Sequence, residues 1–277
     1  MSDAVVERRT RLGTVRHDLA DEQAALDDLV ADLDDARWEL ATPSPGWSVA
    51  DQIGHLTYFD ASATTAILDP ERFRAGLDDL VRAASRDGID EYTLAPFRAL
   101  SHRGQLATWR EHRAALAEAT TTLREDTRVT WYGPSMGATS FVSARLMETW
   151  AHGTDVAEAL GVTPVATDRL EHVARLGHRT RAWSYRVRGE GVPDGNVGVE
   201  LRAPSGLVWS WGDESDADCV RGSAEEFCLV VTQRRHVDDT SLESGDLGRD
   251  WLLRAQAFAG AASNGPPPRR TRATRRD

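Results

Sequence analysis

A glutamate and a histidine four residues apart, Glu148 and His152, are the residues of this chain best placed to do chemistry. They lie in a stretch from Ser140 to Leu160 that predicts one helix, so both side chains project from the same face, one turn apart. At that spacing a carboxylate oxygen and an imidazole nitrogen can reach one divalent ion at about 2.0–2.2 Å each. Asp155, three residues after His152, is expected either to accept the N–H of His152 and fix its tautomer or to be a further ligand.

The alternative is a solvent-facing stripe of ion pairs. Arg145, Glu148, His152 and Asp155 follow i,i+3 and i,i+4 spacings, and such surface pairs contribute only about 0.2–0.5 kcal/mol each. Apolar side chains border this stripe and also occupy the far side of the helix, so we expect the helix to be largely buried, and buried Glu and His need partners. The apolar residues are Phe141, Ala144, Ala151, Val156, Ala159, Leu146, Trp150, Ala157 and Leu160.

A distant histidine, His55, is the candidate third ligand. It follows the segment TPSPGWS, whose prolines and glycine interrupt helical structure. Ser48, the last residue of that segment, is a good N-cap for a helix over 49–68, because its hydroxyl can accept from free N–H groups of the first turn. On that helix His55 shares its face with Tyr58, Phe59 and Ser62, which points it toward a semi-apolar interior. Taken alone, a histidine there is most often a hydrogen-bonded core residue.

Periodicity and breakers predict an α+β protein whose first part is a four-helix bundle. We expect the bundle domain over residues 10–185, a small α/β domain over 190–262, and a disordered Pro- and Arg-rich tail over 263–277, with the boundary near 188–196. In the first domain we expect long helices at 14–40, 49–68, 101–123 and 140–160, a short amphipathic helix and loop at 69–90, a loop from 129 to 140, and a further helix at 168–183. In the second domain we expect a hairpin of 197–204 with 206–213, a third strand at 217–223, and helices at 224–233 and 249–261.

The segments GWSVADQIGHL, at 46–56, and ARLMETWAHGTDVAEALG, at 144–161, resemble the DinB-like metal-binding superfamily. More narrowly, they resemble the mycothiol-dependent maleylpyruvate isomerase N-terminal family of actinobacteria, over roughly residues 10–185. The resemblance implies a zinc ion held inside the bundle by His55, Glu148 and His152, which match the family's His and Glu-x-x-x-His positions. It also implies, more loosely, a C-terminal domain similar to sterol-carrier folds.

Composition limits the possible partners. The net charge of −11 argues against nucleic acid or an anionic membrane as the main partner. The last nine residues carry +4, which we expect to be a solubilising tail or a weak intramolecular contact rather than a nucleic-acid arm. All 33 basic residues are Arg, so Schiff-base chemistry and a Walker P-loop are excluded, and the composition fits a high-GC actinobacterial gene. The N-terminus has no apolar signal region, and no stretch is long enough to span a bilayer, so a cytoplasmic protein is expected.

Three functions remain open at this stage. The resemblance implies a mycothiol-dependent isomerase or thiol transferase acting on a small acidic or electrophilic substrate, in which the metal makes the thiol available as a thiolate. The rival enzyme is a hydrolase that uses zinc-activated water, with Asp51 or Asp155 as the base. The third is a non-catalytic, metal-dependent binding module. Trp109, His112 and Arg113 are candidate walls of a substrate pocket, although ordinary packing and a solvated Arg are the more common explanation for such residues. Cys219 and Cys228 are expected to be structural.

Overall fold

The computed structural model describes residues 10–213 and 215–269, and its contacts divide the chain into an N-terminal unit, Met1–Val165, and a C-terminal unit, Ala166–Asp277. Both helices and a small mixed sheet are present, which confirms the α+β class. None of the described helices is long and apolar enough to cross a membrane.

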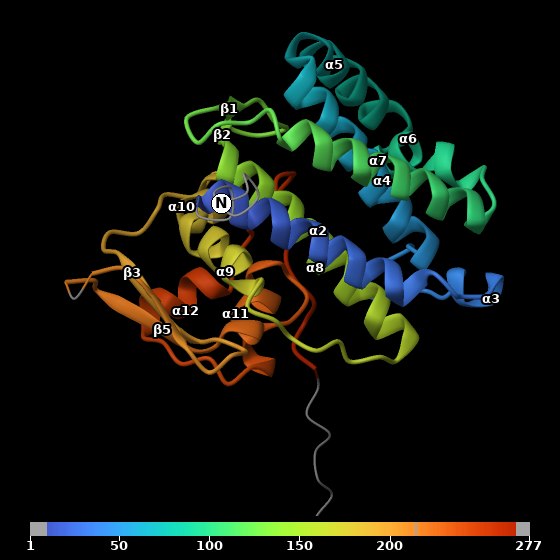
Figure 1. The fold of residues 1–277 in the computed structure, drawn as a ribbon. Helices are drawn as coiled ribbons and strands as arrows, with labels where there is room; N and C mark the ends of the chain where they lie inside the picture. The colour runs from blue at the N-terminus through green and yellow to red at the C-terminus, as the bar shows by residue number, and fades with distance from the viewer. Residues whose placement is uncertain (1–9, 214, 270–277) are drawn as a thin grey trace, which may run out of the picture. The chain divides into compact units, whose positions relative to one another are not determined.

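Helices α2, α4, α7 and α8 pack together as a bundle in the N-terminal unit (Figure 1). Helix α4 packs against α7 and α8, and α2 packs against α8 and α7. Their shared core is apolar and includes Ile53, Leu56, Trp109 and Val156, each fully buried. The bounds are α2 at Arg11–Val30, α4 at Val49–Leu68, α7 at His102–Thr120 and α8 at Ala138–Leu160.

Helix α4 begins where the sequence predicts it, and its first turn shows why. The Ser48 hydroxyl accepts from the backbone N–H of Asp51 at 3.2 Å, and the Asp51 carboxylate accepts from the N–H of Ser48 at 3.1 Å. This reciprocal capping box satisfies two backbone donors that the helix itself cannot. At the C-terminal end of α8, Gly161 adopts the left-handed conformation, with φ of 68°, and ends the helix, as its position after Leu160 predicts.

Elsewhere in this unit, the structure contains more and shorter helices than hydrophobic periodicity predicts, because capping residues end one helix and begin the next. The first helix ends at Val30 rather than residue 40, and Asp34 caps a separate short helix, α3 at Asp35–Trp38. The segment at 69–90, predicted as a short helix and a loop, is almost entirely one helix, α5 at Pro70–Asp87. A further helix, α6 at Ile89–Arg98, begins after Gly88, whose φ is 90°. The predicted loop before α8 contains a two-stranded ribbon, β1 at Arg128–Val129 and β2 at Met136–Gly137.

The C-terminal unit combines a three-stranded sheet with short helices. Strand β3, Val197–Arg202, is central: it pairs antiparallel with β4, Val208–Trp211, and parallel with β5, Asp218–Ser223. The hairpin of β3 and β4 turns at Gly206, whose φ is 88°. The helices are α9 at Leu170–Arg179, α10 at Arg181–Arg186, α11 at Ala224–Val231, a 3-10 turn η1 at Val237–Asp239 and α12 at Asp246–Leu252.

The structure places the domain boundary about twenty residues before the predicted 188–196. Helix α9 packs against α11, and Gly177 lies so close to Val231 that a Cβ on it would meet that side chain at 2.7 Å. The helix predicted at 168–183 therefore belongs to the C-terminal unit, as two helices. Helix α12 also begins and ends earlier than the predicted 249–261.

Only the first part of the predicted tail, 263–269, is described. There the Arg269 backbone N–H donates to the Asp239 carboxylate at 2.9 Å, and the Ser263 hydroxyl donates to Gln233 at 2.8 Å. The Arg-rich end, 270–277, lies outside the described residues, so the expectations for it stay predictions.

A buried ion pair joins α4 to α8. The Arg145 guanidinium lies 2.9 Å from the Asp60 carboxylate, and their side chains are 3% and 0% exposed. Gln23 on α2 donates to the same carboxylate at 3.3 Å. Since Arg145 precedes Glu148 by one helical turn, this pair sets the register in which α8 meets α4.

We expect Asp60→Asn to destabilise the protein by about 3–5 kcal/mol, because it leaves the Arg145 charge buried without a counter-charge. Urea unfolding measures the change. The double variant Asp60→Leu with Arg145→Met removes both charges and should recover much of the loss. The exposed pair of Asp79 and Arg82 supplies the control, and Asp79→Ala should shift stability by no more than about 0.5 kcal/mol. Equal effects of Asp60→Asn and Asp79→Ala would contradict the prediction.

Candidate metal centre

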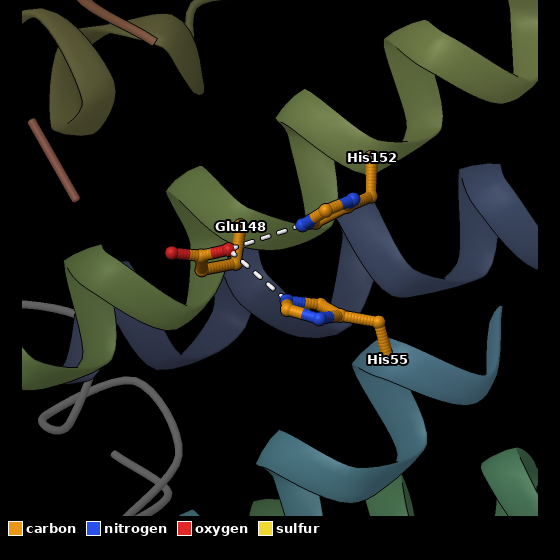
Figure 2. Close-up of side chains that lie close together, drawn as sticks. All are labelled: His55, Glu148 and His152. Atoms are coloured by element: carbon orange, nitrogen blue, oxygen red, sulfur yellow. Dashed lines mark hydrogen bonds and ion pairs between the residues drawn. The ribbon is translucent and has the colours of Figure 1, made fainter. Parts of the chain in front are cut away.

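The structure brings the three predicted ligands together (Figure 2). His55 comes from α4, and Glu148 and His152 come from α8, and one candidate ligand atom of each lies within 4.8 Å of the others. The Oε2 atom of Glu148 is 3.7 Å from Nε2 of His55 and 3.2 Å from Nε2 of His152. Both imidazoles thus direct Nε2 at one carboxylate oxygen. The spacing predicts that Glu148 and His152 lie together, and the structure adds His55 to them.

Burial and mutual contact determine the charge states of the group. Burial opposes ionisation of Glu148, but hydrogen bonds from His152 and His55 outweigh it and hold the pKa of this carboxyl well below its usual range. Burial, aided by the neighbouring His152, lowers the pKa of His55 to about 4. Near neutral pH the group therefore offers an ionised carboxylate and a neutral His55 imidazole.

These donors fit a divalent cation. A carboxylate and two imidazole nitrogens are a common set of protein ligands for zinc, and three ligands leave a further coordination position for another molecule. The side chains of His55 and Glu148 are 17% and 22% exposed, whereas that of His152 is 8% exposed, so the group opens to solvent on the side of the first two. The same donor set suits several divalent metals.

The residue that contacts the other nitrogen of His152 is Gln52, which sequence reasoning missed. Nδ1 of His152 makes a short hydrogen bond to Oε1 of Gln52, on α4. The structure places Asp155 elsewhere: its carboxylate accepts from the Ser44 hydroxyl at 3.0 Å. The sequence signal was present, since Gln52 precedes His55 by one helical turn, but nothing local says which face of α8 it meets.

Aromatic rings flank the two histidines. Trp47 stacks on His152, with ring centroids 5.9 Å apart and planes 14° from parallel, and lies 5.0 Å from His55. The Phe59 ring also packs against His55, with ring centroids 4.5 Å apart and planes at 48°. The Trp47 indole N–H donates to Asp90 at 2.9 Å, so the loop that carries it is tied to α6. The GW motif thus contributes a wall to the site.

The other candidate residues make structural contacts. Both oxygens of Asp51 are engaged, one by the Ser48 backbone and the other by Arg98 at 2.8 Å. Trp109 is fully buried in the bundle core. Arg113 donates to the Gln23 carbonyl at 2.7 Å and to Asp27, with its guanidinium 4.7 Å from the Trp109 ring centroid.

These contacts explain Trp109 and Arg113 by core packing and by attachment of α7 to α2, and they do not support a substrate-binding role for either residue. His112, between them in the sequence, is half-buried on α7. The rings that contact His55 are those of Trp47 and Phe59, and the role of the α7 residues in binding a substrate stays a prediction.

The fold and the triad together define a protein with a helical bundle, a small mixed sheet and a candidate His–His–Glu metal centre. Residues 19–157, which include all three candidate ligands, match the family model described as the mycothiol maleylpyruvate isomerase N-terminal domain. The chain belongs to this family, as its motifs predict.

Further comparisons find similar chains and a similar fold. Uncharacterized proteins from two strains of Mycobacterium tuberculosis are each 44% identical over 251 residues, which covers 90% of this chain and 96% of theirs. The crystal structure of the mycothiol-dependent maleylpyruvate isomerase matches with a TM-score of 0.55 at 16% identity, over 84% of this chain and 92% of that one. A histidine-to-alanine mutant of that enzyme matches with a TM-score of 0.54 at 15% identity, with the same coverage. At this identity the likeness establishes a shared fold across both units.

We expect the metal-free protein to lose stability as the pH falls from about 6.5 to 4. The folded state keeps His55 neutral in this window because its pKa is lowered to about 4, whereas the unfolded chain protonates it, so the unfolded state binds more protons. The full effect of this one residue is up to about 3 kcal/mol.

Urea unfolding of chelator-treated protein across this pH range measures the effect, as the difference between wild type and His55→Gln. His17→Gln, at an exposed position on α2, supplies the same substitution outside the site for comparison. A His55→Gln variant with the same pH dependence as wild type would refute a buried, neutral His55.

Proposed function

We propose that this chain binds a divalent metal ion, zinc in the first instance, through His55, Glu148 and His152, and acts as a mycothiol-dependent isomerase or thiol transferase. The observation that carries the proposal is the convergence of both Nε2 atoms on one oxygen of an ionised, half-buried carboxylate. Family membership and the shared fold with a mycothiol-dependent enzyme support the choice of thiol. The predicted sterol-carrier likeness of the C-terminal unit stays a prediction.

A bound divalent ion supplies a positive charge that favours the ionised form of a thiol or of water. The residues of the chain hold the donors in place: α8 presents Glu148 and His152 one turn apart, and α4 presents His55 against them. The rings of Trp47 and Phe59 pack against the imidazoles of His152 and His55 and help to hold their orientation.

The thiol must come from a cosubstrate, because the chain's own thiols are poorly suited to attack. Burial raises the pKa of Cys219 and raises that of Cys228 well above its usual range, so both stay protonated near neutral pH. They also lie in the C-terminal unit, on β5 and α11. This agrees with a mechanism in which the small-molecule thiol supplies the nucleophile.

The contacts of Asp51 and Asp155 weigh against the hydrolase alternative. A metal-assisted hydrolase needs a carboxylate positioned to take a proton from water. Asp51 is engaged by Arg98 and by the Ser48 backbone, and Asp155 accepts from Ser44, so each expected base already has a structural role. A thiol cosubstrate makes no such demand once its thiolate is formed.

Metal analysis tests the site itself. Purified wild-type protein loaded with zinc and then dialysed should retain about one equivalent per chain, as expected for a three-ligand site. His55→Ala and His152→Ala should lose the metal on dialysis because each removes one of three ligands. His17→Ala, at an exposed position on α2, should retain it. Equally negligible zinc in wild type and all variants would sink the proposed metal centre.

Calorimetry with mycothiol tests the function. We expect mycothiol to bind the zinc-loaded protein and to bind far more weakly after metal removal, because the ionised thiol is stabilised only by the cation. S-methylated mycothiol is the control, and it should lose most of the zinc-dependent affinity. Absence of binding together with turnover of an ester or amide would favour the hydrolase, and absence of both would favour a non-catalytic binding module.

A further inference from the structure

Gln52 lies between α4 and α8, directly behind one of the candidate ligands. It is fully buried, at 0% exposure, and precedes His55 by three residues on α4. Its side-chain oxygen contacts Nδ1 of His152, the nitrogen turned away from Glu148. A buried amide must satisfy both its oxygen and its nitrogen, so the partner of the nitrogen decides how the group is oriented.

That partner is Thr42. Nε2 of Gln52 lies 2.8 Å from the Thr42 hydroxyl oxygen. The same hydroxyl donates its one hydrogen to the Trp47 carbonyl at 3.0 Å, so toward Gln52 it can only accept. The amide nitrogen therefore faces Thr42 and the amide oxygen faces His152, an orientation assigned from the hydrogen-bond network.

This orientation determines where His152 carries its proton. An amide oxygen only accepts, so Nδ1 must carry a hydrogen. The neutral imidazole then has its free lone pair on Nε2, the atom 3.2 Å from Glu148. With Nδ1 committed to Gln52, Nε2 is the atom that faces Glu148, and it can do so either through a second proton, as a hydrogen-bond donor, or through a metal ion that takes the place of that proton.

We infer that Gln52, oriented by Thr42, is a positioning residue that holds His152 in the tautomer with Nδ1 protonated and Nε2 available to a metal. This rests on the proposed metal centre and adds a residue that no spacing motif contains. The loop of residues 42–47 contributes to the orientation of His152 in two ways. Its Thr42 hydroxyl orients the Gln52 amide, and its Trp47 ring stacks on the imidazole. A hydrogen-bonded partner of this kind makes a ligating histidine more basic and fixes its ring.

Two readouts on full-length variants test the inference. Zinc affinity is measured by competition with a chromophoric chelator at fixed pH. The His152 tautomer is read from long-range ¹H–¹⁵N spectra of histidine-labelled protein, with and without zinc. Gln52→Ala should weaken zinc binding by about 10- to 100-fold and abolish the preference for the Nδ1–H form. Gln52→Glu keeps an accepting oxygen and should bind zinc at the wild-type level or more tightly.

A matched control and a milder variant separate positioning from folding. Gln105, on α7, is buried to a similar extent at 3% exposure, and Gln105→Ala should leave zinc affinity and tautomer unchanged. Thr42→Val keeps the shape of the side chain but removes the acceptor that orients the amide, and should weaken zinc binding less than Gln52→Ala does. It therefore provides the test if circular dichroism shows Gln52→Ala to be misfolded.

The outcomes distinguish this inference from the proposed function. Wild-type affinity and tautomer in Gln52→Ala, or losses in Gln52→Glu as large as in Gln52→Ala, would overturn the role of Gln52 and leave the metal centre intact. Failure of the wild type to bind zinc would refute the metal centre. Even then, the tautomer of His152 in metal-free protein would still decide whether Gln52 holds its proton at Nδ1.

Discussion

The antiparallel pairing of α4 with α8 through polar side chains is the constraint on which the candidate site depends. Arg145, Glu148, His152 and Asp155, in that order along α8, each meet a partner that lies progressively earlier in the chain. The partners are Asp60, His55 and Gln52 on α4 and Ser44 in the loop before it. Because each of these contacts buries polar atoms that need a partner, a shift of either helix by one turn would leave several of them unsatisfied.

Along this series of contacts, exposure changes in a way that suits a binding site. The pair of Asp60 and Arg145 is almost entirely buried, at 0% and 3% exposure. One turn further along α8, Glu148 and His55 reach 22% and 17%. The buried pair can hold the two helices in register without access to water, while the neighbouring group of ligands stays within reach of a small molecule. A buried ion pair is weak evidence for stability, and fixing the register of two helices is the role that this geometry supports.

The chain belongs to the mycothiol maleylpyruvate isomerase N-terminal family, and this membership establishes its relatives but not its reaction. Its matched region, residues 19–157, contains the whole triad as well as Gln52 and Trp47. The likeness of fold reaches into the C-terminal unit, because the match to the solved isomerase covers 84% of this chain.

Local sequence determined the parts of this protein that depend on neighbours along the chain. Ser48 and Asp51 set the start of α4, Gly161 set the end of α8, and the i,i+4 spacing placed Glu148 and His152 on one face. These features were predictable because helical caps and helical periodicity involve residues within one or two turns of each other.

Tertiary structure alone decided which faces meet. Asp155 and Gln52 both stood one turn from a ligand, yet only Gln52 faces His152, because α4 packs on α8 in one register. Arg98 donates a hydrogen bond to Asp51, and Arg113 donates one to Asp27, although the partners are 47 and 86 residues apart in the sequence. Helix α9 joined the C-terminal unit because its glycine fits against Val231, which no local pattern reveals. Periodicity assigns a side chain to a face of its helix, but only long-range packing brings that face against its partner.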